Sequence, residues 1–289
     1  MTSGAEGSAA PAGPVQRKPV FVGYDGSDAS KRAVLWAAGY AGAAQLPLVV
    51  VHCWVWPFFT QDLGPVAGIQ DSGLRREAQR VAAEGQDLAV QAEPDLDVSK
   101  RLVAGFPAEV LTRLSAEASL LVTGTRGLGG FAGLLVGSVS LHLASSASCP
   151  IMVVREEHPD HDSVVVAVDG SPESERAVVV AADLARTLHT SLQLLHVRAY
   201  RRHPLPDPLL GEGEPVLERA SALLGERAGI EVSQDLVIAP SVPGMIVQRA
   251  QNAACGVLGA KGSNTLGARL GSTVHAVLHH ARGNVVVVR

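Results

Sequence analysis

One segment of this sequence combines closely spaced glycines with a cation and hydroxyl groups, which is the chemistry of an anion site. It contains Gly124, Arg126 and Gly127 and, after nine further residues, Gly137, Ser138, Val139 and Ser140. Glycines let the backbone approach a bulky group and adopt positive φ. Successive N–H groups, together with the N-terminus of a helix that begins at Gly137, can hold phosphates. The segment therefore predicts a phosphate site.

An aspartate upstream supplies complementary chemistry. Asp25 and Gly26 directly follow the apolar run 19–24 and precede a turn that leads into a helical pattern. A carboxylate is unsuited to phosphate, but it accepts hydrogen bonds from an adenine amino group or a ribose hydroxyl. An anion site beside such an acceptor predicts a nucleotide, although Asp25 taken alone could equally be a turn or capping residue.

The same pattern recurs in the second half of the chain, in the same order. The counterparts are Asp169, Gly170, Val197 (which matches Cys53), Gly259, Lys261, Gly262, Gly271, Ser272 and Thr273. A long internal repeat predicts two homologous domains. We expect domains at 18–155 and 163–289, a linker at 156–162, and a tail at 1–17 that is disordered because it has few large apolar groups.

Apolar runs alternate with helical patterns in both halves, which predicts an α/β fold. The expected strands are 19–24, 46–54, 96–104, 119–123 and 151–154, and then 164–168, 192–197, 231–238, 256–258 and 285–288. This alternation implies two tandem five-stranded parallel sheets flanked by helices. Ligands bind such sheets beyond the carboxyl ends of the strands, where the strand order reverses. Asp25, Cys53 and Gly124 end or follow the first, second and fourth strands, so they should converge on one crevice.

The composition argues against several other classes of protein. A net charge of −4 gives no basic surface for nucleic acid. The chain has no run of 18 apolar residues and opens with no signal peptide, so we expect no membrane span. Cys53, Cys149 and Cys255 are isolated in sequence, which favours a reducing cytoplasm and no metal cluster.

Two competing glycine motifs fit poorly. The segment 124–129 has the spacing of a Walker loop, but Gly130 stands where the lysine belongs. The segment 127–132 matches a dinucleotide fingerprint, but it follows the fourth strand rather than the first. Neither motif therefore displaces the mononucleotide interpretation.

The histidines are interpreted as structural. His52 and His196 lie inside apolar runs, where a hydrogen-bonded side chain is a better explanation than a general base. His279 and His280 lie on a helix with no cluster of ligands around them. We therefore predict no catalytic residue and no metal ligand.

The spacing Gly124-x-x-Gly127-x9-Gly137-Ser138, with Asp25 and His52 upstream, resembles the ATP-binding branch of the universal stress protein family in its tandem form. The resemblance covers residues 18–289. It implies a Rossmann-like sheet of the adenine nucleotide alpha-hydrolase type in each half, with pairing through the last strand. It also implies Asp25 at the adenine, the backbone of Cys53 along the base, and Gly124, Gly127, Gly137, Ser138 and Ser140 at the ribose and phosphates.

The second half departs from the first at its glycine loop. Eight residues rather than nine separate Gly262 from Gly271, and Lys261 replaces Arg126. Near the end, Gly283-Asn284 replaces Cys149-Pro150. A deletion redirects the N–H groups of the loop, so we expect both halves to bind a nucleotide and the second half to bind it more weakly.

These observations predict a cytoplasmic tandem universal stress protein that binds ATP, with Mg²⁺ on the phosphates. It would act as a sensor or regulator with at most slow hydrolysis. The two halves should form a pseudo-dimer through the last strands, which end at Arg155 and Arg289. A homodimer is a further expectation; a nucleic-acid or membrane partner is not. Two alternatives stay open: an adenylate-forming or flavin-binding enzyme of the related adenine-binding group, and an interaction module with vestigial sites.

Overall fold

A computed structural model describes residues 17–54, 73–127, 136–156, 161–200, 213–225, 229–262 and 270–289. The first half contains β1 (Val20–Gly23), α1 (Asp28–Ala44), β2 (Leu48–Trp54), α2 (Gly73–Ala92), β3 (Val98–Ala104), α3 (Pro107–Leu114), β4 (Leu120–Gly124), α4 (Ser138–Ser146) and β5 (Ile151–Val154). The second half contains β6 (Ser163–Ala167), α5 (Pro172–Thr187), β7 (Ser191–Ala199), α6 (Gly213–Leu224), β8 (Val232–Ala239), α7 (Val242–Gln251), β9 (Cys255–Gly259), α8 (Ser272–His280) and β10 (Val285–Val288). The predicted strands are confirmed, and their ends agree within two residues.

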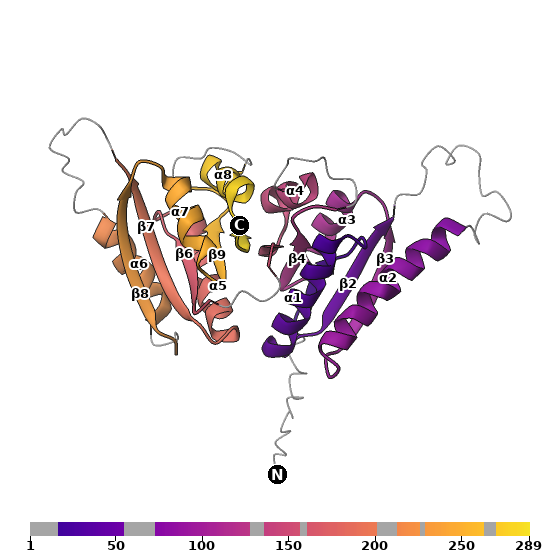
Figure 1. The fold of residues 1–289 in the computed structure, drawn as a ribbon. Helices are drawn as coiled ribbons and strands as arrows, with labels where there is room; N and C mark the ends of the chain where they lie inside the picture. Colours follow the sequence, from indigo (N-terminus) through magenta and orange to yellow (C-terminus); the bar gives the residue numbers. More distant parts are fainter. Residues whose placement is uncertain are drawn as a thin grey trace, which may run out of the picture.

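The two five-stranded parallel sheets join into one sheet of ten strands (Figure 1). The strand order is β3-β2-β1-β4-β5-β10-β9-β6-β7-β8, and neighbours are parallel except at the centre. There β5 and β10 pair antiparallel, with Met152 opposite Val286. The expected contact between the last strands is therefore present, and the sequence had not indicated that it would make the sheet continuous.

Helices cover both faces of the sheet, and each face has its own apolar layer. The helices α1, α2, α5 and α6 pack on one face, and α3, α4, α7 and α8 pack on the other. Each layer draws buried residues from both halves, so the core continues across the seam between β5 and β10. With few aromatics available, valine, alanine and leucine fill most of the space, and many valines suit strands that are covered on both faces. No helix among the described residues is both long and apolar enough to cross a bilayer.

A set of polar contacts fixes the seam beyond the strand pairing. The side chain of Asn284 is fully buried, and its Oδ1 accepts hydrogen bonds from the N–H groups of Arg155 (2.7 Å) and Glu156 (3.0 Å). Its Nδ2 donates to the Glu156 carbonyl at 3.1 Å. The Arg155 guanidinium donates to the carbonyl of Leu278 in the last turn of α8 at 2.6 Å. Burial lowers the pKa of Arg155 to about 10, which leaves it charged at neutral pH.

These contacts explain the change from Cys149-Pro150 to Gly283-Asn284. Proline has no side-chain donor or acceptor and could not replace Asn284 in this role. A Cβ at Gly283 would lie 2.6 Å from the carbonyl oxygen of Ala250, so the chain passes too close to α7 for any side chain there. Asn284 thus serves the seam, and Gly283 serves the packing against α7.

Candidate functional site

A cavity of about 290 Å³ opens at the carboxyl ends of the first-half strands, where the strand order reverses between β1 and β4. The predicted residues that line it are Asp25, Cys53, Gly124, Arg126, Gly127, Gly137, Ser138, Val139 and Ser140. Gly26 is predicted as well but does not line the cavity. Three separate segments thus meet where a doubly wound sheet normally holds its ligand.

The Asp25 carboxylate is held in place by the turn that starts α1. Its Oδ1 accepts hydrogen bonds from the N–H (3.1 Å) and hydroxyl (2.6 Å) of Ser27, the residue that caps the helix. The hydroxyl of Ser30 accepts from the Asp25 N–H at 3.3 Å. Gly26 has a φ of +86°, which explains the glycine in this turn and its position outside the cavity. One oxygen of Asp25 therefore orders the turn before the Ser27 cap, and the Asp25 side chain lines the cavity.

His52 supports the same turn from the neighbouring strand. Its Nδ1 is 2.8 Å from the carbonyl oxygen of Tyr24, and His196 makes the equivalent contact with Val168 at 2.6 Å. The structural interpretation of both histidines is confirmed. Their role is to fix the end of the first strand in each half.

The glycines of the loop are required for two different reasons. A Cβ at Gly124 would lie 2.6 Å from the backbone of Ala29, so this glycine allows α1 to pack on β4. A Cβ at Gly127 would collide with the Asp25 carboxylate, so this glycine makes room for the acid. Gly127 therefore connects the loop to the aspartate, whereas Gly124 belongs to the helix packing.

The N-terminus of α4 forms the opposite wall. Gly137 is its N-cap, no side chain caps the helix, and the Gly137 N–H donates to the Thr125 carbonyl at 2.6 Å. The first N–H groups of a helix have no partner within it and carry a partial positive charge, so Ser138 and Val139 offer an anion site. The buried hydroxyl of Ser140 donates to the Gly124 carbonyl at 3.1 Å, which makes it a brace between strand and helix.

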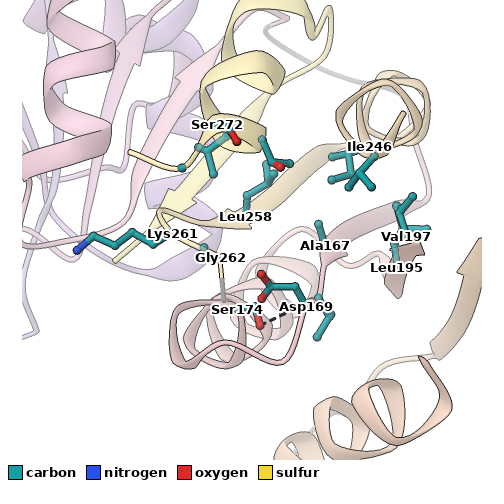
Figure 2. Close-up of a pocket in the computed structure, with 16 residues that line it drawn as sticks. Ala167, Asp169, Ser174, Leu195, Val197, Ile246, Leu258, Lys261, Gly262 and Ser272 are labelled. Atoms are coloured by element: carbon teal, nitrogen blue, oxygen red, sulfur yellow. Dashed lines mark hydrogen bonds between the residues drawn. The ribbon is translucent and has the colours of Figure 1, made fainter. Parts of the chain in front are cut away.

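The second half repeats this construction around a cavity of about 220 Å³ (Figure 2). The predicted residues that line it are Asp169, Val197, Gly259, Lys261, Gly262, Gly271, Ser272 and Thr273, whereas Gly170 does not. The hydroxyl of Ser171 donates to Asp169 Oδ1 at 2.6 Å, and a Cβ at Gly262 would lie 2.5 Å from Asp169 Oδ2. The arrangement of aspartate, glycine and helix N-terminus is thus present twice.

The two cavities differ in polarity and in the position of their cation. Leu258 and Val274 occupy the places of Thr123 and Ser140, so the polar brace of the first half becomes apolar in the second. Figure 2 shows the Lys261 side chain directed away from Asp169. Lys261 also lines a separate crevice near the seam. The weaker binding expected of the second half stays a prediction.

Sequence reasoning missed the wall that a helix contributes to each cavity. Pro107 and Leu111 of α3 line the first, and Val242 and Ile246 of α7 line the second. Residues four apart share one face of a helix, and both helices begin at the edge where the ligand crevice lies. That spacing was a usable signal for this wall.

Cys53 lines the first cavity, but its thiol is not activated. Burial raises the pKa of Cys53 to about 12, and burial does the same for Cys149 and Cys255. Because the thiolate is the reactive form, we expect the native protein to react with a disulfide reagent at pH 8 roughly a thousandfold more slowly than an ordinary thiol. Absorbance after mixing with Ellman's reagent measures this rate, and unfolding in urea should release three reactive thiols. A fast-reacting thiol in the native protein would contradict the burial of these cysteines.

The described residues contain no group of three or more histidine, cysteine or carboxylate side chains that could hold a metal ion. Each cavity supplies groups suited to binding a ligand: a fixed carboxylate acceptor, backbone N–H donors and a helix N-terminus.

The fold and the two cavities define a tandem α/β protein of Rossmann-like architecture. The universal stress protein family model matches residues 16–155 and again 161–289, and the chain belongs to this family. The universal stress protein Rv2005c of Mycobacterium tuberculosis is 33% identical over 293 residues, which cover 96% of this chain and 98% of the relative.

One solved structure that spans nearly the whole chain shares its fold. A universal stress protein from Archaeoglobus fulgidus covers 93% of this chain and 98% of its own, with a TM-score of 0.71 at 21% identity. A universal stress protein solved in complex with cAMP covers 48% of this chain and 97% of its own, with 30% identity and a TM-score of 0.37.

Proposed function

We propose that each half of this universal stress protein binds ATP at the carboxyl ends of its strands, and that the first half binds it more tightly. The observation that carries the proposal is the placement of a fixed carboxylate, Asp25, against Gly127 and across one cavity from the uncapped N-terminus of α4. The cavity thus offers an acceptor for the adenosine part and a positive wall for phosphates. The same placement recurs at Asp169, Gly262 and α8.

The size of the first cavity suits this ligand when the phosphates extend outward. About 290 Å³ is near the lower end of ligand pockets, which span about 300–1,000 Å³. Arg126 is exposed and lines the cavity, so it can meet phosphates at the mouth. Mg²⁺ would bind mainly to phosphate oxygens and water, as this ion commonly does.

The proposed role is that of a sensor or regulator in the cytoplasm. Hydrolysis would be slow at most, because the described residues that line the first cavity include no histidine or lysine, and their one carboxylate, Asp25, is held by Ser27. The three cysteines are free, which suits a reducing compartment. A homodimer, if formed, would need other surfaces than β5 and β10, because these strands already pair within the chain.

Calorimetric titration of nucleotide-free protein with ATP and Mg²⁺ tests the proposal. We expect one tighter and one weaker site. Asp25→Asn should weaken the tighter site about 10- to 100-fold, because a hydrogen bond to a charged group contributes about 1.5–3 kcal/mol. Gly127→Ala should weaken the same site by displacing the carboxylate.

Matched variants assign each effect to one half. Asp169→Asn and Gly262→Ala should alter only the weaker site. Gly39→Ala, in α1, has open space around the new methyl group and should change neither site. ATP affinity that survives unchanged in both Asp25→Asn and Gly127→Ala would show that the ligand binds elsewhere.

A further inference from the structure

Two histidines on α8 differ from the structural histidines of the strands because their rings contact each other. His275 and His279 are four residues apart and lie on one face of the helix. Their ring centroids are 4.5 Å apart, and the ring planes are tilted by 44°. Whereas His52 and His196 bond backbone carbonyls, neither of these rings makes a hydrogen bond within the described part of the chain.

The separation of the two rings matches that of two imidazoles on one metal ion. A metal–nitrogen bond of about 2.1 Å places each ring centre roughly 3.2 Å from the metal. For angles at the metal from about 90° to 109°, the ring centres then lie roughly 4.5–5.2 Å apart. The observed 4.5 Å is at the lower end of this range, so the separation of the two rings is compatible with a shared ion.

The charges around the pair both favour and oppose a cation. Burial lowers the pKa of His279, and His275, His280 and Arg155 lower it further, which favours the neutral imidazole that binds metals. The positive charge of Arg155 also opposes a metal ion, although its guanidinium is directed to the carbonyls of Leu278 and Gly283. The described residues add no third ligand, so water would complete the coordination.

We propose that His275 and His279 chelate a divalent transition-metal ion of the kind that imidazole prefers, with affinity in the order Cu²⁺, Ni²⁺, Zn²⁺. The spacing is that of two zinc-binding histidines on one helix face. His280, which is adjacent to His279 in the sequence, projects from a different side of the helix. His275 was not predicted from the sequence as the partner of His279.

The position of the pair gives the ion a structural consequence. The helix α8 begins at Ser272 in the wall of the second cavity. Near its other end, the Leu278 carbonyl accepts the hydrogen bond from Arg155 across the seam. A chelated ion would therefore stabilise the helix that connects the second cavity to the seam.

The test uses the full chain without an affinity tag and without nucleotide, so its result does not depend on ATP binding. Nickel chloride titrated at pH 7.5 should give one saturable site per chain by calorimetry and raise Tm by several degrees. His275→Ala and His279→Ala should each abolish both effects.

Two controls separate this site from other histidines. His142→Ala removes an exposed histidine from α4 that has serines, not histidines, four residues away on either side, and it should leave nickel binding intact. His280→Ala should also leave it intact. Loss of binding in His142→Ala, binding that persists in His275→Ala, or nickel-dependent dimers in size-exclusion chromatography would each overturn the chelate within one chain.

Discussion

Replacing Gly124 with alanine is expected to lower the free energy of unfolding by about 3 kcal/mol, at the upper end for overpacked cores. The new methyl group would lie 2.6 Å from the backbone carbon and oxygen of Ala29, and neither can move without shifting α1. Gly259→Ala should behave alike, because its methyl group would lie 2.7 Å from the backbone of Glu173 in α5. Urea unfolding followed by circular dichroism measures both effects.

Gly39→Ala is the matched control for this experiment. Gly39 lies inside α1 with no atom near the added methyl group, so alanine should stabilise the protein by about 0.5–1 kcal/mol. A Gly124→Ala protein as stable as the unmodified protein would contradict the close contact between α1 and β4. The same clash means that substitutions at Gly124 cannot isolate a loss of ATP binding from a loss of packing, which is why the binding test uses Gly127.

Replacing Asn284 with alanine should cost about 2–3 kcal/mol, because it leaves buried donors at the seam without partners. Asn284 makes three hydrogen bonds to Arg155 and Glu156 and is fully buried. The loss would fall on the junction between the halves rather than on either cavity. Equilibrium unfolding in urea measures the change in stability.

Asn252→Ala provides the comparison, since Asn252 is an exposed residue at the end of α7. Its replacement should change stability by no more than about 0.5 kcal/mol. An Asn284→Ala protein as stable as the Asn252→Ala protein would mean that the strand pairing alone holds the seam.

The elements of this fold could be predicted because local chemistry marks their ends. The strand at 151–154 matches the expected bounds, and α4 begins directly after Gly137, where a helix was expected to start. Gly137 is the N-cap of this helix, and Cys149-Pro150 separates the helix from the strand. The meeting of Asp25, Cys53 and Gly124 followed from a rule about parallel sheets and did not require side-chain detail. Features that depend on neighbouring residues or on a general rule for parallel sheets could therefore be predicted from the sequence.

Other features depended on neighbours that sequence spacing does not reveal. Gly124 and Gly127 are the same residue type three positions apart, yet one faces Ala29 and the other faces Asp25. The direction of Lys261 and the burial of Asn284 depend on how the two halves meet. The pairing of His275 with His279 on α8 could have been predicted, because residues four apart lie on one face of a helix.

The antiparallel pairing of β5 with β10 gives this chain a freedom that a dimer of identical subunits lacks. In a twofold-symmetric assembly, every substitution appears on both sides of the contact at once. Here Asn284 bonds to Arg155, whereas its repeat counterpart is Pro150, so the contact is made on one side of the seam and not at the equivalent place on the other. Two identical subunits could not make such a one-sided contact. Because both halves lie in one chain, each half can change its own side of the seam independently. The first half is therefore better matched to the second half of the same chain than to the first half of another chain.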